Sequence, residues 1–146
     1  MKPFVKLAGL VLLFLISVSS AYSGDPRLPP DTHMVGVVFH KGADTAHVVD
    51  EIKGGQPVMY RFKPGKGQSL VVELRPKDEN TEFVLFAPGK WPGAELHDSA
   101  AKGSRQYSGQ VDRDGMHAVL VPRRAGADLA ASERYDLVIT IKGAAR

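Results

Sequence analysis

Histidine is the commonest metal ligand in proteins, and this chain of 146 residues has five: His33, His40, His47, His97 and His117. No two of them have the spacing of a metal site on one predicted element. Asp112 and Asp114, followed by Gly115, resemble the start of a calcium loop, but Met116 stands at the third ligand position and the closing glutamate is missing. We therefore expect no metal and no cofactor, and interpret residues 112–115 as a hairpin turn.

The residue types that carry nucleophilic catalysis are poorly placed in this sequence. The chain contains no cysteine, which excludes a thiolate nucleophile, a disulfide scaffold and a thiolate zinc site. A Gly-x-Ser-x-Gly nucleophile elbow is absent, and neither Ser104 nor Ser108 has an adjacent histidine. Glu73 and Glu95 stand in contexts typical of exposed carboxylates. We predict no catalytic residue and no enzymatic activity.

Two features suit the binding of a partner protein. Arg123 and Arg124 stand together at the start of a predicted loop, and the planar guanidinium of arginine binds a carboxylate bidentately. Such a pair could enter an acidic cleft or could simply be solvated. Trp91, the only tryptophan, lies between Lys90 and Pro92. It is interpreted either as a plug over the edge of the core or as an exposed aromatic anchor.

The elements that must position these residues are β-strands, because apolar and polar residues alternate along most of the chain after His33. Turn signals separate the strands, and no amphipathic helix is evident beyond one helical turn at 129–132. The predicted strands lie near residues 35–39, 46–52, 58–63, 70–75, 83–86, 107–111, 116–121 and 134–142. The pattern predicts an all-β fold, a single β-sandwich or jelly-roll-like domain of about eight antiparallel strands.

Two predicted connections are unusually long, at 88–106 and 123–133, and long loops on a rigid sheet are common places for function. Counting antiparallel strands predicts that both loops and the 64–67 turn emerge at the same end of the domain. That end would gather the basic residues Lys66, Lys90, Lys102, Arg105, Arg123 and Arg124.

The N-terminal segment has the features of a secretory signal peptide. Lys2 and Lys6 precede an apolar run of about a dozen residues, too short for the roughly 20 of a membrane span, and small residues end at Ala21. We predict a signal peptide at 1–21, a flexible proline-rich leader at 22–32 and the β-sandwich domain at 33–146. The mature chain is expected to be exported to the periplasm and to have no membrane span.

Composition and charge bound the function further. Hydrophobic residues make up 43% and charged residues 24%, as in ordinary globular domains. Removal of residues 1–21 takes away two of the 19 basic residues and none of the 16 acidic ones, so the formal net charge falls from +3 to +1. This small excess does not suggest nucleic acid or an anionic membrane as a partner. The oligomeric state stays open.

Several short segments, in order along nearly the whole mature chain, carry a resemblance to a known family. They are VFHKG at 38–42, EIKG at 51–54, YRF at 60–62, KGQ at 66–68, LFAPG at 85–89 and RYDLVITIK at 134–142. With these segments the chain resembles the periplasmic inhibitors of g-type lysozyme of Gram-negative bacteria. A wider resemblance is to the β-sandwich modules appended to secreted bacterial peptidases.

The resemblance implies a compact β-sandwich that inhibits g-type lysozyme by inserting surface loops into the substrate cleft, where a catalytic acid lies. It implies that Arg124 is the recognition arginine of the 123–133 loop. Our own hypothesis adds Arg123 and Arg105 as further cleft contacts and Trp91 as a rim anchor. The family's second loop arginine has no counterpart here, where the stretch reads Ala127-Asp128-Leu129-Ala130. The alternative is a secreted binding module of the peptidase-associated type with another envelope or protein ligand.

Overall fold

The computed structural model describes residues 28, 31–77, 81–122 and 130–144. The predicted signal peptide, Arg123 and Arg124 lie outside these residues. The described elements, in chain order, are β1 (His33–Gly36), β2 (Thr45–Lys53), β3 (Val58–Phe62), β4 (Ser69–Pro76), β5 (Val84–Ala87), β6 (Ala94–Asp98), α1 (Ser99–Lys102), β7 (Gln106–Gln110), β8 (His117–Val121) and β9 (Ser132–Lys142).

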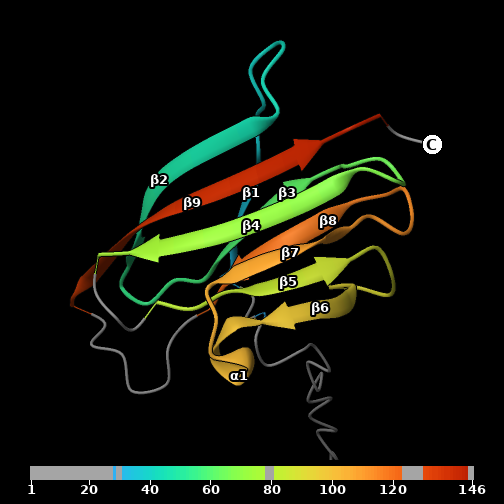
Figure 1. Ribbon diagram of the computed structural model, residues 1–146. Coiled ribbons are helices and arrows are strands. Elements are labelled where there is room, and N and C mark those ends of the chain that lie inside the picture. The colour runs from blue at the N-terminus through green and yellow to red at the C-terminus, as the bar shows by residue number, and fades with distance from the viewer. Residues whose placement is uncertain (1–27, 29–30, 78–80, 123–129, 145–146) are drawn as a thin grey trace, which may run out of the picture.

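The strands form two sheets, which confirms the prediction of a β-rich, sandwich-like domain (Figure 1). Sheet A has five strands in the order β1-β3-β8-β5-β6, and sheet B has four in the order β2-β9-β4-β7. The predicted count of about eight antiparallel strands is wrong in two respects. The described residues contain nine strands, and β1 pairs with β3 in parallel, with His33 opposite Val58.

Alternation of side chains explains why these segments become strands of a two-layer domain. In β4, Leu70, Val72 and Leu74 are buried, whereas their neighbours point away from the core. The strand β8 is different, because all five of its residues are buried. Both faces of sheet A are therefore covered around β8, and the strand reads as a continuous run rather than as an alternation.

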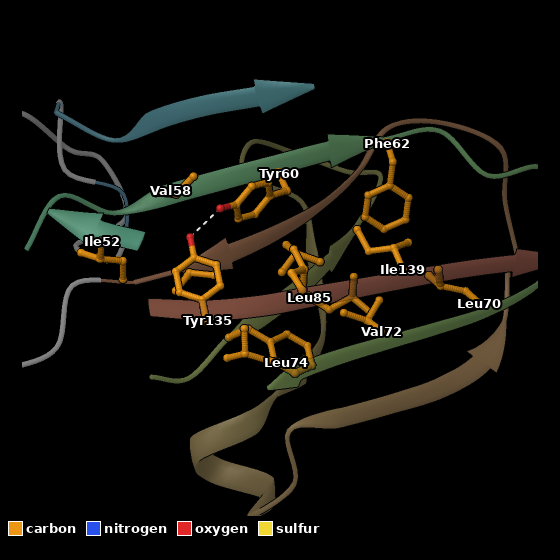
Figure 2. Packing of buried hydrophobic residues seen from close by; sticks show 14 of the residues in the cluster. Ile52, Val58, Tyr60, Phe62, Leu70, Val72, Leu74, Leu85, Tyr135 and Ile139 are labelled. Atoms are coloured by element: carbon orange, nitrogen blue, oxygen red, sulfur yellow. Dashed lines mark hydrogen bonds between the residues drawn. The ribbon is translucent and has the colours of Figure 1, made fainter. Parts of the chain in front are cut away.

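The main core lies between the two sheets (Figure 2). Sheet A contributes side chains from β3, β5 and β8, and sheet B contributes side chains from β2, β4 and β9. Its largest fully buried side chains are Tyr60, Tyr135 and Phe83. A second, smaller cluster forms on the other face of sheet A from Leu28, Met59, Val84, Phe86, Ala118 and Leu120. Leu28 belongs to the predicted leader, and it is only 5% exposed.

The predicted loop at 88–106 is not a loop, because it contains β6 and α1. The strand β6 pairs antiparallel with β5 at the edge of sheet A and exposes most of its residues. Asp98 caps α1 by accepting hydrogen bonds from the amides of Ala100 and Ala101, and Gly103 ends it with a φ of 64°. An exposed edge strand needs little apolar periodicity, so the sequence pattern gave no signal for it.

The extra strand β6 reverses the chain once more and overturns the predicted gathering of basic residues at one end. Val84, at the start of β5, pairs with both Asp98 and Leu120, while Ala87, at the end of β5, pairs with Ala94. The end of β8, α1 and the start of β9 therefore share one end of the domain, whereas the 88–93 turn lies at the other. We call these the Arg105 end and the Trp91 end.

Candidate interaction surface

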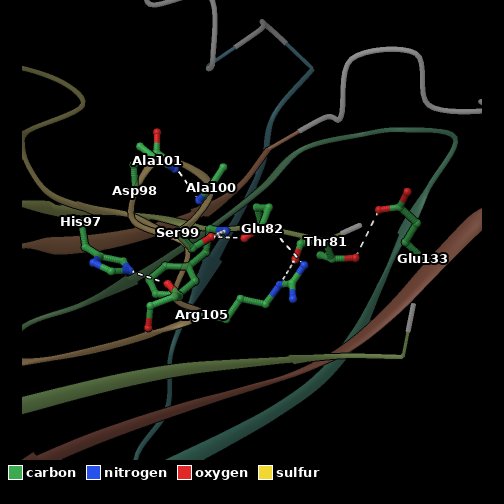
Figure 3. Close-up of polar contacts among 11 residues, drawn as sticks. Thr81, Glu82, His97, Asp98, Ser99, Ala100, Ala101, Arg105 and Glu133 are labelled. Atoms are coloured by element: carbon green, nitrogen blue, oxygen red, sulfur yellow. Dashed lines mark hydrogen bonds and ion pairs between the residues drawn. The ribbon is translucent and has the colours of Figure 1, made fainter. Parts of the chain in front are cut away.

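Arg105 directly precedes β7, and its guanidinium is paired within the fold (Figure 3). Its Nε donates to the carbonyl oxygen of Thr81 at 2.9 Å, and its Nη2 lies 2.7 Å from Oε1 of Glu82. The side chains of Arg105 and Glu82 are 33% and 30% exposed. The charge of this arginine is thus balanced within the fold, so its first role is to fix the segment before β5.

The same glutamate continues the network into α1. Its second carboxylate oxygen accepts a short hydrogen bond from the hydroxyl of Ser99, and that hydroxyl oxygen accepts from the amide of Phe83 at 2.8 Å. On the other side, the hydroxyl of Thr81 donates to the carboxylate of Glu133 at 3.3 Å. These contacts join α1, the segment before β5 and the start of β9, as Figure 3 shows.

A second polar network joins the strands β2, β3 and β9. The hydroxyl of Tyr60 donates to Oδ2 of Asp50 at 2.6 Å and lies 2.5 Å from the hydroxyl of Tyr135. Because the single hydroxyl hydrogen of Tyr60 is used in the hydrogen bond to Asp50, Tyr135 is the donor in the bond between the two tyrosines. Burial raises the pKa of both tyrosines, and for Tyr60 the hydrogen bond to Asp50 raises the pKa further. The pair is a neutral, structural link between β3, β9 and β2.

A groove of about 440 Å³ runs along the adjoining parts of β2 and β9. Its charged lining consists of Asp50, Glu51, Lys53, Lys77, Arg134 and Asp136. The three cations face three carboxylates, so the lining carries no excess charge. Pairing is local: Lys53 and Arg134 lie 3.0 and 3.6 Å from Glu51, and Lys77 lies 3.8 Å from Asp136. The hydrogen bond from Lys53 lowers the pKa of Glu51.

The predicted site residues do not form one cluster. Arg105 is paired with Glu82, and Trp91 lies at the opposite end, 61% exposed. Lys66 is also at the Trp91 end, because its amide donates to Asp114 in the turn before β8. Arg123 and Arg124 lie outside the described residues. The strands that flank them end and begin at the Arg105 end, where Val58 pairs with Val121 and Ile52 with Glu133.

The sequence did not identify the Asp50–Tyr60–Tyr135 network or the charged groove. A signal for the network was present, because Asp50 interrupts the apolar alternation of its strand and a buried tyrosine hydroxyl needs a partner. The groove had no comparable signal, since it joins residues of β2 and β9 that are more than 80 positions apart. Within the described ranges, no three histidine or acidic side chains are grouped as a metal site. None of the described helices has the length and apolar character to cross a membrane.

The two-sheet β architecture is shared with proteins of known structure. Aeromonas hydrophila PliG, a periplasmic lysozyme inhibitor of g-type lysozyme, has the same fold with a TM-score of 0.67. It is 24% identical, and the match covers 77% of this chain and 98% of that chain. For Salmonella Typhimurium PliG the TM-score is 0.54 at 27% identity, over 75% and 98% of the two chains.

At the level of sequence, the chain is 28% identical to the inhibitor of g-type lysozyme of Escherichia coli (strain K12). The match runs over 127 residues, which are 87% of this chain and 75% of that protein. The resemblance to such inhibitors is therefore confirmed. No family model matches the chain. The pre-peptidase C-terminal domain of a Bacillus anthracis collagenase is similar in fold alone, with a TM-score of 0.50 at 12% identity.

Proposed function

We propose that the chain is a periplasmic inhibitor of g-type lysozyme, a binding protein without enzymatic activity. The observation that carries this proposal is the 28% identity over 127 residues to an inhibitor of that enzyme. The shared two-sheet fold with a second such inhibitor, at 27% identity, supports it. Residues 1–21 would direct export and be removed, and residues 22–146 would act in the periplasm.

The inhibitory contact is assigned to the connection between β8 and β9, which carries Arg123 and Arg124. An arginine inserted into the substrate cleft would pair with the catalytic acid there and also exclude the glycan. The described residues supply a rigid base for this connection. Glu133 at the start of β9 is tied to Thr81, and Thr81 in turn is tied to Arg105. Arg105 is thus a positioning residue in this proposal rather than a cleft contact.

A turbidity assay with purified residues 22–146 tests the proposal directly. The protein is mixed with a g-type lysozyme, and lysis of permeabilised cell walls is followed, with c-type and i-type lysozymes run alongside. We expect stoichiometric inhibition of the g-type enzyme alone. A folded sample that leaves the g-type enzyme fully active at micromolar excess would overturn the proposal and favour a binding module with another ligand.

Two substitutions locate the contact. Arg124→Ala should weaken inhibition about 30-fold or more, because losing a charge-assisted contact in a buried interface costs roughly 2–5 kcal/mol. Lys66→Ala is the matched control, since it removes a cation at the Trp91 end. Equal loss of inhibition in both variants would mean that overall charge, rather than an inserted arginine, governs binding.

A further inference from the structure

A hollow of about 340 Å³ lies at the Trp91 end, on the face of sheet A that points away from the main core. Its walls are formed by Arg61, Pro88, Trp91, Pro92, Met116 and Ala118. Trp91 and Met116 are 61% and 49% exposed, so a large apolar surface faces solvent there. The 88–93 turn places this hollow at the end of the domain opposite Arg105 and the start of β9.

Arg61 supplies the charge of the hollow. It is an exposed residue of β3, and its guanidinium makes no ion pair within the part of the chain that the structure describes. In this it differs from Arg105, which is paired with Glu82, and from Arg113, which lies 3.6 Å from Asp112. An unpaired guanidinium and an indole ring that line the same hollow favour a ligand that is both anionic and apolar on one face.

The walls of the hollow are held in place by the backbone. The amide of Gly93 donates to the carbonyl of Lys90 at 2.8 Å, which closes the turn that carries Trp91. Gly115 packs against Pro88 so closely that an added Cβ would lie 2.8 Å from the proline ring. Arg113 also donates to the carbonyl of Pro88 at 3.4 Å. The indole is therefore carried by two joined turns, so the backbone of these turns would lose little conformational freedom on binding.

We propose that this hollow binds one pyranose ring that carries a carboxylate, as the muramic acid unit of peptidoglycan does. The apolar C–H face of the ring would stack on the indole of Trp91, and the carboxylate would pair with Arg61. Size favours a single ring, because 340 Å³ is at the low end of ligand pockets, which span roughly 300–1,000 Å³. A stable protein interface needs about 800 Å² on each partner, so the size of the hollow favours a small ligand over a protein. Exposed charged residues such as Lys63 and Lys90 lie next to the segments that line the hollow, which favours the same choice.

Because Trp91 is the only tryptophan, its indole N–H gives one unambiguous signal in a ¹⁵N–¹H spectrum of residues 22–146. N-acetylmuramic acid is titrated first, and N-acetylglucosamine, the same ring without the lactyl carboxylate, is the matched ligand. We expect a saturable shift of the indole signal with N-acetylmuramic acid, and binding about 10-fold weaker with N-acetylglucosamine. No saturable shift, or equal binding of the two sugars, would overturn the proposal.

Variants separate the two contacts and keep this test distinct from lysozyme inhibition. Arg61→Gln should abolish the preference for the carboxylate-bearing sugar, whereas Arg75→Gln, an exposed arginine of sheet B, should retain it. Trp91→Ala should lose binding of both sugars, as read from the remaining backbone signals. Arg61→Gln should still inhibit g-type lysozyme as well as the unsubstituted chain. An indole signal that responds to g-type lysozyme but to neither sugar would assign the hollow to a protein interface instead.

Discussion

The hydroxyl oxygens of Tyr60 and Tyr135 lie 2.5 Å apart in the core, and the hydroxyl of Tyr60 donates its hydrogen bond to Asp50. The two rings meet edge to face, with centroids 6.4 Å apart. This chain of hydrogen bonds has a direction, from Tyr135 through Tyr60 to the carboxylate. Two substitutions that each remove one hydroxyl therefore have different consequences.

Tyr60→Phe should destabilise the protein more than Tyr135→Phe. Removing the Tyr60 hydroxyl leaves the fully buried hydroxyl of Tyr135 without an acceptor, which costs about 1–3 kcal/mol. Removing the Tyr135 hydroxyl leaves Tyr60 still bound to Asp50, and the cost should be about 1 kcal/mol. Urea denaturation of both variants gives the comparison. A larger loss for Tyr135→Phe would mean that the donor order is reversed.

Alkaline pH should destabilise the fold through the same pair. The pKa of both tyrosines is raised in the folded state, whereas in the unfolded chain it is about 10. Their contribution is fully present below pH 10 and is lost as the pH rises from there toward the folded-state pKa. We expect the free energy of unfolding to fall above pH 10 by up to about 1.4 kcal/mol per tyrosine and pH unit. In a Tyr60→Phe/Tyr135→Phe variant, the free energy of unfolding should fall less steeply with pH above pH 10. In Tyr107→Phe, most of the fall should remain.

Arg105→Ala should affect stability more than inhibition. It removes the partner of Glu82 and the donor to the carbonyl of Thr81, at a cost of about 1–2 kcal/mol for a partly exposed, charge-assisted pair. Arg75→Ala is the control, since the pair with Glu73 is more exposed and should contribute less to stability than the pair of Arg105 with Glu82. Thermal unfolding and the lysozyme assay are run on both. A folded Arg105→Ala protein that inhibits as poorly as Arg124→Ala would make Arg105 a direct contact.

Gly93→Ala should disrupt the turn that carries Trp91. Gly93 has a φ of +130°, and an added Cβ would lie 2.2 Å from the carbonyl oxygen of Ala87. Gly42 also has a positive φ, +80°, but open space surrounds the position of its Cβ. Gly42→Ala should therefore cost only about 1 kcal/mol of backbone strain, and Gly93→Ala at least about 2 kcal/mol more. Similar urea midpoints for the two variants would show that the turn can relax at little cost.

The residue order alone determined the class of fold. Period-two alternation in segments such as 69–76 and 132–142 is a local property, and it predicts both the strand and the face that becomes buried. The ordered motifs likewise pointed to inhibitors of g-type lysozyme, which the comparisons bear out. Predictions of this kind succeed because each depends on a few neighbouring residues and on burial of their apolar face.

Only the tertiary structure decided which side chains meet. The edge strand β6 has almost no apolar pattern, yet it reverses the chain and sends Trp91 to the end opposite Arg105. The partner of Arg105, Glu82, is 23 positions away, and the phenols of Tyr60 and Tyr135 meet across 75 positions. Such pairings depend on strand order and register, which are set by the packing of the whole domain and leave no periodic trace in the sequence.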